Sequence, residues 1–479
     1  MQPRTTALAL ARAFAGSAHA ANDADLAANL GELRAQIDEM KKSYEQRIAA
    51  LEQKLTQAEA KAVGAERKAE AASAATVAAA AARPAPAHAD VHPEIGLFLQ
   101  GKYVAMKNVS ERGITGFVAA AGHEHGEGGI EGENRRGFSV DHTELMLSAS
   151  VDPYWRGMAV LAVQDGEVEV EEAWFQSLAI GHGVGLKGGR FKSGIGYLNE
   201  QHAHQWDFAD APLVYQAFFG SHGSYAQDGV QLKWLAPTPV FLEFGAEIGR
   251  GANFPGSDRN KNGSGAGALF AHAGGDVGIA HSWRAGVSYL RTAARNREAH
   301  FEDVGGLEAV GAFSGRSRIW GADFVWKWAP DGNPKTRNFK FQTEYFQRRE
   351  AGELTCSDDE GAGNACDPLA AGDSVTSRTR TRQSGWYAEG VYQFSPQWRA
   401  GLRYEQLDSG RRDFGSNAAN LVVENYKPKR ASLMADYNWS EFSRVRLQYA
   451  HDRSMAGLTD HQWTLQYVMS LGAHGAHRF

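Results

Sequence analysis

Apolar and polar residues alternate with a period of two along the last stretch of the chain. The apolar positions are Trp463, Leu465, Tyr467, Met469 and Leu471, and the polar positions are Gln462, Thr464, Gln466 and Ser470. This alternation predicts a β-strand with a different environment on each face. In a soluble protein the apolar face would pack on a second layer, whereas in a transmembrane barrel it faces lipid and the polar face lines water.

The same alternation recurs in short runs from residue 94 to the end of the chain. We count about 16 runs, an even number like that of single-chain bacterial barrels. They lie at residues 94–106, 138–151, 155–164, 168–179, 184–193, 228–235, 240–250, 268–279, 282–291, 317–328, 338–350, 382–394, 398–408, 429–439, 443–452 and 462–479. Trp and Tyr gather near the ends of the runs, as in the aromatic girdles of membrane barrels.

The links between these runs differ in length in a regular way. Tight links occupy residues 152–154, 181–183, 237–239, 330–334, 395–397 and 440–442, and long links occupy 107–137, 194–227, 251–267, 292–316, 351–381 and 409–428. Short periplasmic turns that alternate with long outer loops are typical of a transmembrane barrel. The link at 165–167 is short where a long one is expected, so either that loop is minimal or the strand count is off there.

Residues 22–72 carry a helical pattern instead. From Leu26 the apolar positions follow heptad spacing, with one four-residue stutter at Ile48. So narrow a stripe predicts a periplasmic coiled coil that self-associates through residues 26–66, and the alternative is a lone charged surface helix. The Ala- and Pro-rich residues 73–93 predict a semi-rigid spacer.

The first 20 residues predict a signal peptide. Arg4 supplies the positive charge, residues 7–15 the apolar core, and Ala18-His19-Ala20 the small-residue cleavage site. Arg12 interrupts the apolar core, so an alanine-rich helix start is the alternative.

Composition narrows the class further. The net charge of −6 argues against a nucleic-acid partner. After the leader there is no run of about 18 apolar residues, so no transmembrane helix is expected. The two cysteines, Cys356 and Cys366, bracket a short acidic loop, which favours a disulfide over a metal pair because zinc needs two more ligands.

Two further segments carry a resemblance to a known family. The chain ends on an alternating strand with Phe479, which resembles the C-terminal insertion signal of Gram-negative outer-membrane proteins. The segment 189–196, GRFKSGIG, and the long link after it resemble the strand and inward constriction loop of 16-stranded porins, including phosphate-selective and related porins. The coiled-coil extension is similar to that of sugar, dicarboxylate and siderophore porins. The resemblance implies an all-β transmembrane barrel over residues 94–479, a homotrimer, and contact with the lipid bilayer, lipopolysaccharide and the barrel-assembly machinery.

The parity of the strands predicts which charges line the lumen. Early strands place Glu167, Glu169, Glu171, Glu243 and Glu247 there, and late strands place Arg284, Lys340, Arg348, Arg399, Arg403, Arg430, Arg444 and Arg446. Charges on the lipid face are costly, which favours this assignment. An acidic wall opposite a basic wall would orient dipolar solutes. The alternative is that these charges only pair with one another and stiffen the wall.

Histidines form a second signal. His123 and His125 lie in the first long link, and Glu200, His202, His204, Asp207, Asp210 and His222 lie in the expected constriction loop, 194–227. Imidazole and carboxylate groups suit a divalent metal such as zinc, so His123, His125, His202 and His204 are candidate ligands. The alternative is a pair of solvated polar loops.

These observations favour a porin-like channel for passive diffusion of small hydrophilic solutes across the outer membrane of a Gram-negative bacterium. An uptake porin for a metal ion or a siderophore-like chelate is the second hypothesis, and a tether to peptidoglycan through the coiled coil is the third. We expect no enzymatic activity, because the chain has no G-x-S-x-G or H-E-x-x-H motif and no Walker lysine.

Overall fold

A computed structural model describes residues 93–109, 112–117, 135–164, 167–220, 223–358, 366 and 374–472, together with scattered helical residues between Gly31 and Gln53. The strands are β1 (Glu94–Ala105), β2 (Gly137–Ser150), β3 (Trp155–Gln164), β4 (Glu167–Ser177), β5 (Val184–Lys192), β6 (Ala226–Leu235), β7 (Phe241–Gly249), β8 (Ala266–Val277), β9 (His281–Arg297), β10 (His300–Glu302), β11 (Glu308–Trp328), β12 (Asn338–Asp358), β13 (Val375–Gln393), β14 (Trp398–Asp413), β15 (Lys429–Ser440), β16 (Ser443–Arg453) and β17 (Asp460–Gly472).

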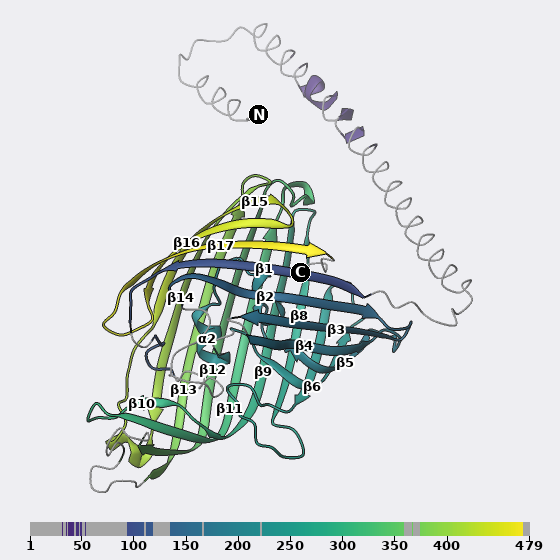
Figure 1. Ribbon diagram of the computed structural model, residues 1–479. Coiled ribbons are helices and arrows are strands. Elements are labelled where there is room, and N and C mark those ends of the chain that lie inside the picture. Colours follow the sequence, from purple (N-terminus) through teal and green to yellow (C-terminus); the bar gives the residue numbers. More distant parts are fainter. Residues whose placement is uncertain are drawn as a thin grey trace, which may run out of the picture. The chain divides into compact units, whose positions relative to one another are not determined.

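These strands form one closed antiparallel sheet (Figure 1). Each long strand pairs with its neighbours in the chain, and β9 pairs directly with β11 because the three-residue β10 pairs only with the start of β11. The ring closes where β1 pairs with β17, from Gly96 opposite Gly472 to Ala105 opposite Trp463. Apart from β10, the described sheet is a ring of sixteen strands, which confirms the predicted barrel.

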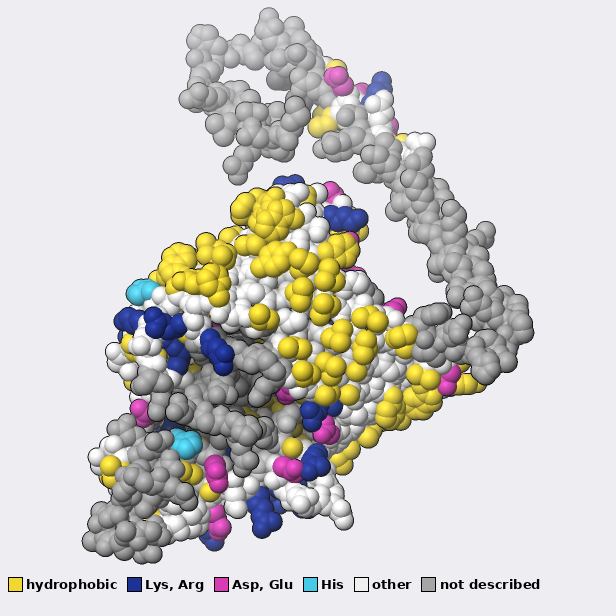
Figure 2. Space-filling view, viewed as in Figure 1, with side chains coloured by type: hydrophobic (Ala, Val, Ile, Leu, Met, Phe, Trp, Pro, Cys, Tyr) yellow, Lys and Arg dark blue, Asp and Glu magenta, His cyan; other side chains and the backbone are white. Residues whose placement is uncertain are grey.

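The wall has its apolar side chains outside and its polar side chains inside. Trp320 and Leu433 on the outer face are 57% and 56% exposed, whereas Arg446 and Glu344 on the inner face are 0% and 1% exposed. Figure 2 shows apolar side chains spread over the outer wall. This arrangement is the reverse of a soluble core and is the one that a lipid bilayer stabilises.

Aromatic side chains gather on the outer face at two levels. Towards the short turns, Trp398 stacks edge-on against Tyr437 with ring centroids 4.9 Å apart. Towards the long loops, Tyr289 contacts Trp320 at 4.5 Å and Tyr449 contacts Trp463 at 4.9 Å. Two such girdles mark the two interfaces of the bilayer.

Several strands run further towards the long loops than the alternation predicts. We expect links at 292–316 and 351–381. In the structure β9 ends only at Arg297 and β11 already begins at Glu308, while β12 ends only at Asp358 and β13 already begins at Val375. Beyond the bilayer the outer face meets water, and the apolar residues move to the inner face, where Phe313 and Leu354 pack with Phe414. Strand pairing therefore continues where the lipid-facing pattern has ended.

Two smaller predictions concern the links. β3 ends at Gln164 and β4 begins at Glu167, so the exceptional short link is a minimal loop and the strand count holds. Cys356 and Cys366 form a disulfide, and both are buried in the cluster of Phe313, Leu354 and Phe414.

The predicted signal peptide, coiled coil, spacer and insertion signal at Phe479 lie mostly outside the described residues. Within residues 22–72, the described positions between Gly31 and Gln53 are helical. Among the residues described, no helix combines the length and apolar character needed to cross a bilayer.

Candidate functional site

The connection between β5 and β6 folds into the lumen. It contains the 3-10 turns η1 (Leu198–Glu200) and η2 (Ala203–Gln205) and the helix α2 (Leu213–Phe219), which lies within the ring of strands (Figure 1). Most of its described side chains are buried, which a loop facing water would not need. The link predicted at 194–227 is therefore an inward loop, here called the inner loop, residues 193–225.

Apolar packing fixes the centre of the inner loop. Leu213, Val214 and Phe218 of α2 are at most 1% exposed and belong to one cluster with wall residues Phe346 and Tyr387. Burying an aliphatic or aromatic side chain of this size stabilises by about 1.5–3 kcal/mol. Gly220, with φ of 96°, ends the helix in a conformation that disfavours other residues.

Two wall carboxylates hold the first residues of the inner loop. Glu247 on β7 accepts hydrogen bonds from the Ser193 hydroxyl at 2.6 Å and the Gly194 N–H at 2.8 Å. Glu344 on β12 accepts from the N–H groups of Tyr197 and Leu198 at 2.9 and 3.0 Å. The loop backbone thus satisfies its donors on the wall, as a buried chain without regular structure must.

Two aspartates of the inner loop bind the basic side of the wall. Asp207 contacts Lys340 and Arg399, both at 2.9 Å. Burial would raise the pKa of Asp207, but these two cations outweigh it and hold the pKa well below its usual range.

Asp210 makes the second attachment. It contacts Arg403 at 2.6 Å and Arg430 at 2.8 Å. Burial opposes the charged carboxylate, yet Arg403 and Arg430 keep the pKa of Asp210 well below its usual range. The loop is therefore anchored by ionised aspartates at neutral pH.

Three further arginines of the predicted basic wall donate to inner-loop carbonyls. Arg348 reaches Ala217 O at 3.1 Å, Arg444 reaches His204 O at 2.6 Å, and Arg446 reaches Trp206 O at 3.0 Å. The predicted basic residues thus lie on the inner face, and most of them hold the loop.

The remaining predicted lumen residues are placed less uniformly. Arg284 lies 3.9 Å from Asp323, and Glu243 pairs with His272 at 3.1 Å and with Lys233 at 3.4 Å. Glu169 is exposed, and the side chain of Glu167, like His123, His125 and His222, lies outside the described part. The inner-loop residue Glu200 binds Lys233 at 2.9 Å.

Several inner-face acids were not predicted. Asp436 pairs with Arg446 at 2.8 Å with both side chains fully buried, and Glu405 pairs with Arg403 and Arg430 at 2.9 Å. The signal was present, because Glu405 shares the parity of Arg403 on the same strand. These pairs bring acids to the wall that parity had assigned as basic.

Histidines and glutamates meet where the inner loop passes β2 and β4. His142 Nε2 lies 2.6 Å from Glu171 Oε1, and His202 Nδ1 lies 2.9 Å from Glu171 Oε2 and 3.1 Å from Glu144 Oε2. His204 Nδ1 is 3.1 Å from the same oxygen of Glu144. Two of the four predicted metal ligands therefore lie together, with three residues that the sequence did not single out as ligands.

A bulge produces this cluster. The β3–β4 register shifts between Val160 and Leu161, so that Val160 pairs with Glu172 and Leu161 with Val170. Glu171 is the extra residue, and both it and Glu172 have largely buried side chains on the lumen side. One ligand atom each from His142, Glu144 and Glu171 lie within 4.8 Å of one another, which is close enough to hold a metal ion.

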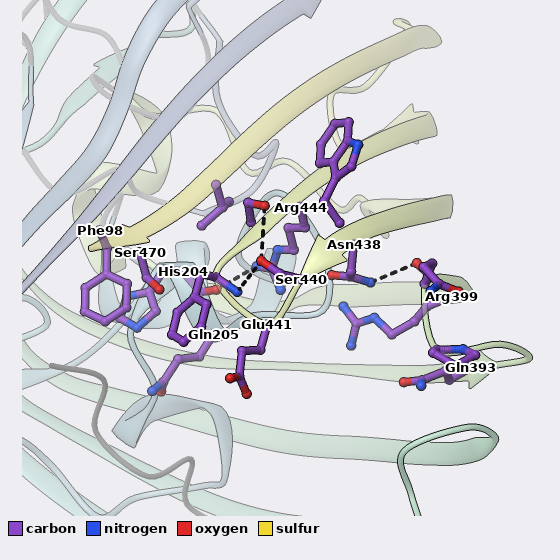
Figure 3. A pocket seen from close by; sticks show the side chains of 16 residues that line it. Phe98, His204, Gln205, Gln393, Arg399, Asn438, Ser440, Glu441, Arg444 and Ser470 are labelled. Atoms are coloured by element: carbon purple, nitrogen blue, oxygen red, sulfur yellow. Dashed lines mark hydrogen bonds between the residues drawn. The ribbon is translucent and has the colours of Figure 1, made fainter. Parts of the chain in front are cut away.

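Within the described part of the chain, two cavities lie beside the inner loop. The first, about 550 Å³, is lined by Arg399, Arg444, His204 and Gln205 and by the short turns at 396–397 and 440–443. Figure 3 shows these side chains around it. The second, about 540 Å³, is lined by Tyr197 and Glu200 of the loop and by Lys187, Lys233 and Arg284 of the wall. Each is large enough for a small polar solute.

An apolar outer wall, a charged lumen and an inward loop define the class of protein: it is a transmembrane β-barrel of the outer-membrane porin type. Solved structures with related barrels include OmpT with loop L8 deleted, an outer membrane protein of Vibrio cholerae (11% identity, 80% of this chain and 99% of that chain, TM-score 0.46). An anion-selective porin from Comamonas acidovorans (9%, 80% and 100%, 0.44) and the outer membrane channel DcaP of Acinetobacter baumannii (14%, 81% and 99%, 0.42) are also similar. Because all three TM-scores are below 0.5, these similarities carry no argument, and the class is assigned from the barrel of this chain itself.

The sequence has a nearer relative. It is 32% identical to an uncharacterized protein of Aquifex aeolicus (strain VF5) over 384 residues, which is 75% of this chain and 72% of that protein. The chain belongs to the same family as this protein. No family model matches the chain.

Proposed function

We propose that the protein is a channel for passive diffusion of small hydrophilic solutes across the outer membrane. The observation that carries the proposal is the pair of polar cavities, about 550 and 540 Å³, that flank the inner loop inside a closed wall. Solutes would pass beside the loop, so its attachment to the wall sets the rate.

Charge in these cavities supports a bias among solutes. Arg399 and Arg444 line the first cavity, and Lys233, Arg284 and Glu243 line the second. Fixed charges in a narrow aqueous path favour ions and dipolar solutes over apolar ones. Two arginines, Arg399 and Arg444, line the first cavity, and Glu441 is the one acid among its described lining residues. The excess of positive charge favours anionic solutes there.

Swelling of proteoliposomes tests the channel. Liposomes that hold the purified full chain are diluted into isotonic sugars, amino acids, phosphate or metal chelates, and light scattering follows their swelling. The proposal expects faster swelling than in protein-free liposomes for solutes that fit the cavities, and faster swelling for small anions than for cations of equal size. Swelling equal to that of protein-free liposomes for every solute would reject it.

A second candidate function is binding of a divalent metal ion, which is favoured by the cluster of His142, Glu144, Glu171 and His202. Glu144 Oε1 is buried without a hydrogen-bond partner and lies 3.9 Å from His142 Nε2. An unsatisfied buried carboxylate oxygen is costly, and a metal ion would satisfy it. Carboxylate and imidazole ligands suit zinc, although the ammonium group of Lys192, 3.6 Å from Glu171, opposes a cation.

Calorimetric titration of zinc into the detergent-solubilised protein separates these possibilities. We expect H142A and E144Q to weaken binding at least tenfold, and the double variant H451A/H461A, which removes two histidines on β16 and β17, to leave it unchanged. Equal binding by the cluster variants and the wild type would eliminate the site, while the channel proposal would stand on the swelling assay.

A further inference from the structure

Five arginines form a continuous row around the outer face of the barrel. Arg318 on β11 lies directly opposite Arg291 on β9 and Arg349 on β12, Arg349 lies opposite Arg382 on β13, and Arg382 lies opposite Arg411 on β14. All five are exposed. Arg291, Arg318, Arg349 and Arg382 each adjoin a buried residue of the inner face, and Arg411 lies opposite Arg382, so the row points away from the lumen.

A β-bulge completes this row. The register between β13 and β14 shifts between Arg382 and Ser384, and Gly410 takes a φ of 65° in the bulge. A Cβ at Gly410 would lie 1.8 Å from Arg382 O, so only glycine fits. The shift places Arg411 opposite Arg382, where a regular ladder would have placed Gly410.

The row is unfavourable by itself. Like charges directly opposite one another in a sheet are destabilising. Among the residues that the structure describes, no carboxylate forms an ion pair with any of the five, and Arg349 donates instead to the amide of Gln347 at 3.1 Å. Two acids lie one step from the row: Asp413, opposite Arg380 on the side of the long loops, and Asp408, opposite Ser384 on the side of the short turns. Asp408 lies 3.6 Å from Lys427 instead. Anions from outside the chain would therefore stabilise the row.

Its height on the wall indicates where these anions lie. Ten residues of β11 separate Arg318 from Trp328 at the short-turn end. At about 3.3 Å per residue and a strand tilt near 40°, the arginines lie ~25 Å above that end, which is the height of the apolar band. Trp320 and Tyr289 of the outer girdle lie one step below the row. The arginines thus face the headgroups of the outer leaflet.

An apolar groove lies directly beneath one end of the row. It measures about 540 Å³ and is lined by Trp234, Phe244, Leu269, Val287 and Trp320, with Tyr289 at its upper end. Its floor includes Ala246 and Ala271, whose small side chains leave the space. A groove of this kind fits a hydrocarbon chain whose headgroup reaches Arg291 and Arg318.

We propose that the arginine row and the groove form a binding site for a phosphorylated lipid of the outer leaflet, with phosphate groups on the arginines and an acyl chain in the groove. Guanidinium groups bind phosphate through two parallel hydrogen bonds, which makes arginine the residue suited to this role. The bound lipid removes the repulsion within the row and so stabilises the wall at β9 to β14.

Binding of a bisphosphorylated glycolipid to the purified full chain in neutral detergent tests the site. The triple variant R318Q/R349Q/R382Q is expected to bind it at least tenfold more weakly than the wild type. The matched control R156Q/K335Q/R337Q removes three exposed basic residues from the short-turn end and is expected to bind like the wild type. Equal binding by the wild type and the R318Q/R349Q/R382Q variant would overturn the proposal.

The unfolding temperature gives a second readout, because the arginine substitutions are expected to have opposite effects on stability without and with the lipid. Without lipid, R318Q/R349Q/R382Q is expected to unfold at the same temperature as the wild type or higher, because like charges have been removed. With the phosphorylated glycolipid, the wild type is expected to gain stability and the variant to gain little. A variant that is less stable without lipid would show that the arginines act only within the chain, and the proposal would fail.

A third experiment distinguishes binding of a lipid from binding of a free anion. A271W fills the groove without changing charge and is expected to weaken glycolipid binding while leaving any binding of inorganic phosphate unchanged. The dephosphorylated glycolipid is expected to bind poorly. Full displacement of the glycolipid by millimolar inorganic phosphate, or undiminished binding by A271W, would overturn the assignment to a lipid.

Discussion

Replacement of Asp210 by asparagine tests how the inner loop is held. The carboxylate of Asp210 accepts hydrogen bonds from Arg403 at 2.6 Å and Gln448 at 2.7 Å and pairs with Arg430 at 2.8 Å. The side chains of the two arginines are only 1% and 5% exposed. Neutralising one partner of a buried ion pair costs about 3–5 kcal/mol.

The lower end of that range applies here. Asparagine keeps one oxygen acceptor, and Glu405 remains beside both arginines at 2.9 Å. A loss of ~3 kcal/mol lowers the ratio of docked to released loop by about a hundredfold. We therefore expect D210N to show a larger single-channel conductance with frequent transitions, and a shift of selectivity towards anions because two arginines lose a counter-charge.

Single-channel recording in planar bilayers measures both effects. The control is D258N, which removes one negative charge from an exposed outer-loop pair with Arg250. It should leave conductance and reversal potential close to those of the wild type. If D210N gave the same traces as D258N, the ion pairs at Asp210 would not hold the loop.

Three further predictions concern charge, pH and the disulfide. R399A removes a cation from the lining of the first cavity and should shift the reversal potential in a salt gradient towards cation selectivity, while an unchanged potential would contradict a role in selectivity. The pKa values of Asp207 and Asp210 are depressed, so the stability they give is present above the unfolded value of 3.8 and is lost only as pH falls through the lower folded values. Conductance should therefore stay constant from pH 7 to pH 4 and rise only in stronger acid, and a rise between pH 6 and 4 would oppose this. Replacing Cys356 and Cys366 by alanine should cost ~2–3 kcal/mol locally, with faster proteolysis of the outer loop but an intact barrel, as judged by limited digestion and heat-dependent migration.

The barrel could be predicted from sequence because lipid imposes one simple rule. Every second residue of a spanning strand must be apolar, so Trp320 and Leu433 reveal their strands without any knowledge of partners. The rule ends at the edge of the bilayer. For that reason the sequence predicts a loop for the outer part of β11, where Phe313 turns inward.

The inner face was harder to predict. Parity places Arg403 and Arg446 in the lumen but does not identify the groups that they bind. Arg403 binds Asp210 and Arg446 binds the Trp206 carbonyl, and both of these groups lie in a loop without periodicity. The bulge at Glu171 also changes parity in the middle of β4. Contacts between distant segments and local register shifts produce no periodic pattern in a sequence, so only the fold reveals the histidine–glutamate cluster.

The seam between β1 and β17 has a consequence for how the protein is made. The Gln466 amide donates to Gln100 at 3.2 Å across 366 positions of the chain. Until the final strand has been synthesised and delivered, the first strand has an open edge, and open edges invite pairing with other molecules. The wall is therefore complete only when the last strand of the chain has paired with the first, so this pairing is the final step in forming the barrel.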